Sequence, residues 1–183
     1  MPSTEIVRFV ELKESKWKNG GGITRKIASA FIDNNCLWRL SMADVTGDGP
    51  FSEFAEYERI LTVVNGHGMT LQSEAESIDA SPWVPVQFSG ALKIFGSLKS
   101  GPLTNLNLMF NPDHCTADLT TISQLCHPSL PRDQRRILVV HSMSGAGKLS
   151  DGPPLLPSAT AITGSDAGRP ARDRESTSRW SAT

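Results

Sequence analysis

The sequence predicts an all-β protein, a sandwich or a barrel, from three observations. Short runs rich in β-branched, aliphatic and aromatic residues recur along the chain. Turn signals built on Gly, Pro, Asn and Asp separate these runs. No segment sustains the 3.6-residue apolar period of an amphipathic helix, and at most Glu53–Tyr57 forms one helical turn. Strands and turns at this spacing are typical of antiparallel β architectures.

The expected strands follow from composition in chain order. They are Glu5–Val10, Thr24–Asp33, Cys36–Val45, Arg59–Asn65, Met69–Gln72, Leu92–Leu98, Thr104–Phe110 and Ile137–His141, with a last strand within Leu155–Thr163. Residues 166–183 are polar and almost free of apolar side chains, so we expect a disordered tail there.

Alternation along three strands predicts which side chains face a cavity. In Cys36–Val45, one face carries Trp38, Leu40 and Met42, and the other carries Leu37, Arg39, Ser41 and Ala43. In Thr104–Phe110, Leu106, Leu108 and Phe110 share one face, whereas Asn105, Asn107 and Met109 share the other. Arg59 is aligned with Leu61 and Val63, and an inward arginine needs an anionic partner from the protein or from a ligand.

Composition narrows the classes of function. The chain has 183 residues, enough for one domain with a substantial core, and its net charge of −1 gives no reason to expect nucleic acid or an acidic membrane as a partner. No apolar run approaches the ~20 residues that cross a bilayer, and Met1–Val10 lacks the apolar core of a signal peptide. Three cysteines without a C-x-x-C pair favour a reducing, cytoplasmic setting.

The sequence contains no complete example of the usual catalytic and metal-binding patterns. His67 stands alone in Gly-His-Gly, and the neighbouring pairs His114-Cys115 and Cys126-His127 do not have the spacing of a zinc site. Ser144–Lys148 resembles the end of a phosphate loop, but Leu149 stands where Ser or Thr is required. No G-x-S-x-G nucleophile elbow is present in the sequence.

Polar, non-metal residues near strand ends and loops are therefore the candidate site. Arginine offers a planar fork that matches a carboxylate, and asparagine supplies both a donor and an acceptor. With aromatic residues as an apolar wall, the candidate ligand-binding set is Trp17, Lys18, Asn19, Thr24, Arg25, Arg39, Ser41, Phe51, Arg59 and Asn107. The alternative for each residue is a structural ion pair or hydrogen bond. The three glycines that follow Asn19 also have two interpretations. They allow the backbone to lie close to another backbone or to a ligand, or they form a flexible hairpin connection.

Several blocks resemble the HutD/Ves family of the RmlC-like cupin superfamily in order and spacing. They are Trp17-Lys18-Asn19-Gly20-Gly21-Gly22-x-Thr24-Arg25, Trp38-Arg39-Leu40-Ser41-x-Ala43, Gly49-Pro50-Phe51-Ser52-x-Phe54, Arg59-x-Leu61, Gly66-x-Gly68-x-x-Leu71, Phe88-Ser89-Gly90, Gly101-Pro102 and Asn107-Leu108-Met109. The resemblance implies a cupin fold of two packed barrel-like halves, a bicupin, over residues 1–165 with the boundary at about 95–115. It also implies a site without the usual cupin metal ligands, and we expect no cofactor.

For function, the resemblance implies binding of a small acidic metabolite, formylglutamate-like, in the regulation of histidine utilisation. The chain departs from the family at Thr104-Asn105, at Phe110–Asp113 and at Ala55-Glu56, which bears on the ligand more than on the fold. Two alternatives stay open. One is a cupin-fold isomerase or hydrolase that uses a side chain such as His67 for acid/base chemistry. The other is a homodimeric interaction protein with a vestigial pocket.

Overall fold

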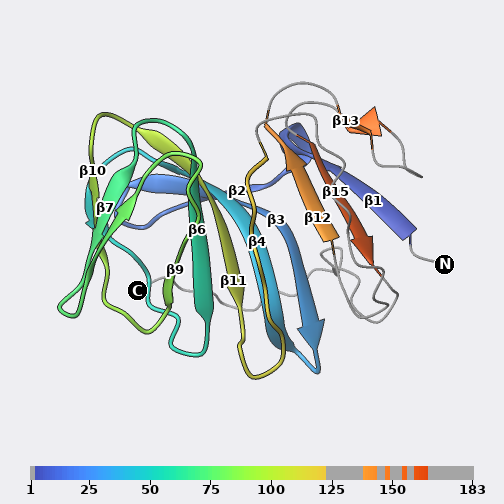
Figure 1. The fold of residues 1–183 in the computed structure, drawn as a ribbon, viewed down its shortest axis with the longest axis horizontal. Coiled ribbons are helices and arrows are strands. Elements are labelled where there is room, and N and C mark those ends of the chain that lie inside the picture. Colours follow the sequence, from blue (N-terminus) through green and yellow to red (C-terminus); the bar gives the residue numbers. More distant parts are fainter. Residues whose placement is uncertain (1–2, 123–137, 144–146, 149–153, 156–158, 165–183) are drawn as a thin grey trace.

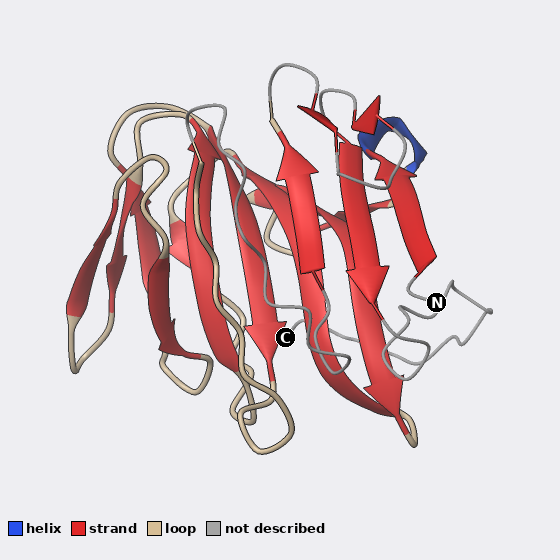
Figure 2. Cartoon of the chain, turned by 45° about the vertical axis from the view of Figure 1, so that its right-hand side comes forward, coloured by secondary structure: helices blue, strands red, loops and turns tan. Residues whose placement is uncertain are grey.

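The structure is a computed structural model that describes residues 3–122, 138–143, 147–148, 154–155 and 159–164. Strands dominate it (Figure 2), and the one helical element among these residues is a short 3₁₀ turn, η1 (Phe9–Glu11). In the part of the chain that is described, no helix has the length and hydropathy needed to span a membrane. The prediction of an all-β protein is confirmed.

A six-stranded antiparallel sheet forms the centre of the fold. Its spatial order is β2-β3-β4-β11-β6-β9, and its strands are β2 (Glu14–Lys16), β3 (Gly22–Ile32), β4 (Asn35–Val45), β11 (Leu103–Phe110), β6 (Glu58–Asn65) and β9 (Val86–Ser89). Every ladder of this sheet is antiparallel. The two inner strands β4 and β11 pair along eight residue positions, from Leu103 opposite Val45 to Phe110 opposite Trp38.

Two smaller sheets flank the central one (Figure 1). The first has the order β5-β10-β7-β8, from β5 (Gly49–Pro50), β10 (Phe95–Leu98), β7 (Met69–Gln72) and β8 (Ser77–Ala80). The second has the order β1-β15-β12, from β1 (Ser3–Arg8), β15 (Ala159–Gly164) and β12 (Leu138–Ser142). A two-residue ladder joins β13 (Gly147–Lys148) to β14 (Pro154–Leu155).

Each face of the central sheet contributes to its own apolar core. On one face, Val45, Leu61 and Leu103 pack with residues of the β5-β10-β7-β8 sheet such as Met69 and Leu71. On the other face, the cluster of Leu40, Met42, Val64 and Leu106 packs against Val7 and Val139 of the β1-β15-β12 sheet. The inner strands are therefore buried on both faces, and alternate residues of one strand supply two different cores. The predicted split of Cys36–Val45 into two faces is confirmed, since Leu40 and Met42 belong to the second cluster and Trp38 packs against it, whereas Val45 belongs to the first.

The described architecture does not confirm the prediction of two packed barrel-like halves. The described sheets lie on both sides of one shared central sheet and do not close into barrels. The short strands β2, β5, β8, β9 and β13 were not predicted. The predicted strand Leu92–Leu98 begins only at Phe95, and Glu53–Tyr57 forms a turn without helix. The predicted disordered tail, 166–183, lies outside the described residues.

The glycine run is the connection of the β2–β3 hairpin. The Trp17 N–H donates to the Gly22 carbonyl at 2.9 Å, and the Gly20 N–H donates to the Trp17 carbonyl at 3.1 Å. Gly20 has φ of +72°, the left-handed region that glycine adopts without steric cost. A Cβ on Gly22 would lie 2.5 Å from the Asp44 carbonyl oxygen and 3.1 Å from the Trp17 ring, so close packing requires glycine at that position.

Candidate functional site

Two arginines lie on the face of the central sheet that looks toward the β5-β10-β7-β8 sheet. Arg39 is on β4 and Arg59 is on β6, and both are directly opposite Met109 of the intervening strand β11. Residues opposite one another in an antiparallel ladder point to the same side of the sheet. The three side chains therefore form one row across the sheet, with a guanidinium group on each side of the Met109 thioether.

Arg59 is buried within a ring of aromatic side chains, with only 6% of its surface exposed. Its guanidinium carbon lies 5.3 Å from the ring centroid of Phe51, 5.8 Å from that of Phe54 and 5.1 Å from that of Phe88. The Nε and Nη2 groups donate to the Asn107 Oδ1 atom at 3.3 and 3.2 Å, and Nη1 donates to the Ser52 carbonyl at 3.4 Å. Burial, and then the charge of Arg39, lower the pKa of Arg59 to about 10, so the group is still charged at pH 7.

Arg39 is less completely hydrogen-bonded. Its guanidinium carbon lies 5.4 Å from the Phe54 ring centroid, and Nη2 donates to the Met109 sulfur at 3.2 Å. The Nε atom is buried and has no hydrogen-bond partner in the described part of the chain. Burial lowers the pKa of Arg39, which the thiol of Cys36 and the phenol of Tyr57 partly offset.

No carboxylate among residues 6–122 and 139–143 forms an ion pair with either arginine. A buried charge without a counter-charge is costly, and the two guanidinium groups also repel one another. Each protonated form is instead stabilised by aromatic faces and by neutral acceptors. The row therefore holds two positive charges for which this part of the protein supplies no anion.

Amide and hydroxyl groups extend this polar surface along the same face. Asn107 lies opposite Ser41 and Leu61 and accepts two of the three hydrogen bonds that Arg59 donates. Ser41 is buried, and its hydroxyl donates to the Asn107 carbonyl at 3.5 Å. The buried Nδ2 atom of Asn105 and the Oγ atom of Ser29, which pairs with Arg39, have no hydrogen-bond partner in the described residues. Unpartnered polar atoms in a buried cluster are rare and call for an explanation such as a bound ligand or water.

The loop after β5 places the aromatic rings over the arginines. The Phe51 N–H donates to the Ile94 carbonyl at 2.8 Å, and the Phe54 N–H donates to the Gly90 carbonyl at 2.7 Å. Phe54, Phe88 and Met109 belong to the site but were not among the predicted site residues. All three lie in the sequence blocks that carry the family resemblance, so that resemblance was the signal that could have identified them as site residues.

The other predicted residues of the glycine loop serve the hairpin in this structure. The Trp17 indole N–H donates to the Thr24 hydroxyl at 2.8 Å, and its ring meets the Phe51 ring edge-on at 6.1 Å. Trp17 therefore supports the aromatic wall from behind. The exposed Asn19 side chain accepts the Gly21 N–H at 3.0 Å, and Lys18 is exposed on the same turn.

His67 is also exposed, with its Nδ1 atom 3.2 Å from the Ser100 carbonyl oxygen.

Arg25 lies on the opposite face of the central sheet. It pairs in register with Met42, and its guanidinium contacts Asp44 at 2.5 Å and Glu14 at 2.6 Å. Its guanidinium carbon also lies 4.8 Å from the ring centroid of Phe9. The hydrogen bond to Asp44 raises the pKa of Arg25, with a smaller contribution from Glu14. Arg25 therefore has two anionic partners within the protein and is separate from Arg39 and Arg59.

The Glu14 contact is an exposed ion pair, which predicts a small energetic effect. We expect Glu14→Gln to lower the free energy of unfolding by less than about 1 kcal/mol, because solvent screens such pairs. Chemical denaturation of the variant and the parent protein measures the difference. A loss several times larger would show that Glu14 stabilises more than this ion pair.

Metal-ligating side chains do not gather at this site. In the described ranges, no group of three or more His, Cys, Asp and Glu side chains could hold a metal ion. The features that stand out are the two arginines, their aromatic surroundings and the adjacent amides. In chemical terms, this is an arrangement suited to an anion with hydrogen-bond acceptors.

Fold and site together define an all-β protein with a candidate anion site on its central sheet. The chain belongs to the HutD family, whose pattern it matches over residues 10–168. It is 34% identical over 122 residues to an uncharacterised 21.2 kDa protein in the hutC 3′ region of Pseudomonas putida, a match over 65% of this chain and 64% of that protein. It is also 30% identical to protein Ves of Citrobacter koseri, over 74% of this chain and 70% of Ves.

Solved structures of similar fold cover most of the chain. HutD from Pseudomonas fluorescens SBW25, in a formate condition, is 24% identical with a TM-score of 0.65, over 90% of this chain and 89% of that one. A conserved protein of unknown function from Pseudomonas aeruginosa PAO1 is 26% identical with a TM-score of 0.64, over 92% and 89%.

Proposed function

We propose that this protein binds a small carboxylate-bearing metabolite between Arg39 and Arg59, without a metal ion. The observation that carries the proposal is a buried pair of guanidinium groups for which the described residues provide no carboxylate. A carboxylate would supply the missing counter-charge and accept a hydrogen bond from the unpartnered Arg39 Nε. It would also reduce the repulsion between the two guanidinium groups, which adds to burial in lowering the pKa of Arg59.

The surroundings favour a ligand with a polar group beyond the carboxylate. Asn107 and Asn105 lie one row and two rows further along β11 on the same face as Met109. Their amides could hold a second acceptor or donor of the same molecule. The aromatic rings of Phe51, Phe54 and Phe88 exclude water from Arg59, and low local polarity strengthens a charged hydrogen bond.

The relatives give the proposal a biological setting. One of them is encoded in the 3′ region of hutC in Pseudomonas putida, and a fold neighbour carries the name HutD. These names support our proposal of a role in the regulation of histidine utilisation, with formylglutamate as the first candidate ligand. We further infer that the two flanking sheets represent two barrel-like halves of the cupin type that share the central sheet.

The test is ligand-dependent thermal stability of the purified full chain. Formylglutamate, glutamate, urocanate and histidine are added separately at millimolar concentration. A ligand that binds only the native state raises the melting temperature, and a hundredfold excess over Kd adds about 2.7 kcal/mol of stability. We expect formylglutamate to raise it, and we expect glutamine, added in the same way as a compound without the side-chain carboxylate, to raise it less. No shift with any carboxylate would contradict the proposal.

A further inference from the structure

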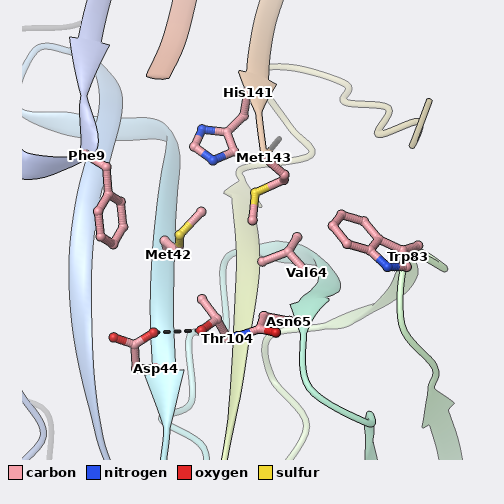
Figure 3. Close-up of a pocket in the computed structure, with 9 residues that line it drawn as sticks. All are labelled: Phe9, Met42, Asp44, Val64, Asn65, Trp83, Thr104, His141 and Met143. Carbon is pink, nitrogen blue, oxygen red and sulfur yellow. Dashed lines mark hydrogen bonds between the residues drawn. The ribbon is translucent and has the colours of Figure 1, made fainter. Parts of the chain in front are cut away.

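A cavity lies on the opposite face of the central sheet from Arg39 and Arg59. It has a volume of about 460 Å³, within the range of small-molecule sites, and lies among β4, β6 and β11 on one side and η1 and the end of β12 on another. Figure 3 shows Phe9 and Trp83 on opposite sides of it, with Met42, Val64 and Met143 between them. Most of its wall is therefore apolar and partly aromatic.

The backbone of Trp83 marks the cavity independently. This residue has φ of +66°, a left-handed conformation that is a true outlier for a bulky side chain. Both of its backbone polar groups are held, since its N–H donates to the Val63 carbonyl at 2.8 Å and its carbonyl accepts the Thr121 hydroxyl at 2.8 Å. The indole nevertheless stays 48% exposed. Strain that is maintained by surrounding contacts is characteristic of binding sites.

The polar end of the cavity carries negative charge. Asp44 accepts the Thr104 hydroxyl at 2.8 Å, drawn as a dashed line in Figure 3, and its other oxygen contacts Arg25. Arg25 also pairs with Glu14, so two carboxylates contact one guanidinium. Asp44, Glu14 and Arg25 together therefore have a net charge of −1. At the other end, burial lowers the pKa of His141, which leaves that imidazole neutral at pH 7.

We propose that this cavity binds a small aromatic amine, with its ring between Phe9 and Trp83 and its ammonium group against Asp44. Aromatic walls and soft methionine side chains suit a flat apolar ring. The net charge of −1 on Asp44, Glu14 and Arg25 together favours a cation over an anion at the polar end. This ligand class is opposite in charge to the one proposed for Arg39 and Arg59, so the two sites are chemically distinct.

The experiment uses phenethylamine as the probe and phenylacetate as the matched compound of opposite charge. Both are titrated into the ¹⁵N-labelled full chain, and the Trp83 indole N–H signal, assigned with Trp83→Phe, reports on the cavity. We expect phenethylamine to shift this signal in a saturable way and phenylacetate to leave it unchanged. Equal effects of the two compounds, or none from phenethylamine at millimolar concentration, would overturn the proposal.

Two carboxylate variants distinguish the contribution of Asp44, which lines the cavity, from that of Glu14, which lies outside it. Asp44→Asn removes the charge and keeps one acceptor oxygen, which can accept from Arg25 while the new amide donates to the Thr104 hydroxyl oxygen, and we expect the Kd for phenethylamine to rise about tenfold or more. Glu14→Gln also cancels the net charge of −1 but keeps the Asp44 carboxylate in the cavity, and because solvent screens the exposed Glu14 the Kd should rise by no more than about threefold. If Asp44→Asn fails to fold, Trp83→Ala on the exposed wall replaces it, with backbone amide signals of the cavity as the reporter in place of the deleted indole, and it should weaken binding by a similar factor. Unchanged affinity in the folded variant would overturn the proposal, whereas loss of carboxylate binding at Arg59 would leave it intact.

Discussion

Arg59→Met is expected to abolish carboxylate-dependent stabilisation while changing the free energy of unfolding of the free protein by less than about 2 kcal/mol. The binding loss follows because a charged hydrogen bond contributes about 1.5–3 kcal/mol, so the loss of one from Arg59 to the carboxylate weakens binding by about tenfold to a hundredfold. The free energy of unfolding changes little because two effects of the substitution oppose one another. Methionine removes a buried charge, but it leaves the Asn107 Oδ1 atom without its donor and ends three aromatic contacts.

The matched control is Arg25→Met, the same substitution on the opposite face of the sheet. Arg25 is neutralised by Glu14 and Asp44, so its loss should reduce stability but leave the carboxylate Kd unchanged. Calorimetric titration with formylglutamate and urea denaturation of both variants measure the two quantities. If Arg59→Met binds as tightly as the parent, or if Arg25→Met loses binding equally, Arg59 does not hold the anion.

Gly22→Ala is expected to destabilise the protein by about 3 kcal/mol. The added Cβ would lie 2.5 Å from the Asp44 carbonyl oxygen, which is backbone and cannot move away cheaply. On its other side, the Trp17 ring carbons at 3.1 Å prevent the strand from shifting. Trp17 packs against Phe51, so the strain would reach the aromatic wall of the site as well.

Gly47→Ala provides the control for the glycine prediction. No atom lies within 4 Å of a Cβ at Gly47, and its φ is outside the left-handed region. We expect this variant to unfold within about 0.5 kcal/mol of the parent, as surface substitutions usually do. Equal stabilities of Gly22→Ala and Gly47→Ala in urea would show that the close approach at Gly22 is not a structural requirement.

Alternation made the long strands predictable from sequence. Residues 36–45 and 104–110 have two buried faces, so β-branched and aliphatic residues concentrate there and the parity of their side chains can be read directly. Strand β2 (Glu14–Lys16) could not be found in this way, since all three of its residues are exposed and polar. It forms a strand because β3 provides a pairing partner, which is a tertiary effect rather than a local preference.

The same reasoning explains which part of the candidate site the sequence could foresee. Parity placed Arg39 and Ser41 on one face, and Arg59 with Leu61 on another strand, as the structure has them. Their common position beside Met109 depends on the register of β11 with both neighbours, and no local pattern encodes that register. The pairing of Arg25 with Glu14 and Asp44 likewise depends on residues brought together by the sheet.

A crystal structure of the protein with bound formylglutamate tests the central claim most directly. The account predicts a ligand carboxylate oxygen about 3 Å from the Arg39 Nε atom and within hydrogen-bond distance of the Arg59 guanidinium or the Asn107 amide. Ligand density at another position, with Arg39 and Arg59 neutralised by carboxylates of the protein itself, would contradict it.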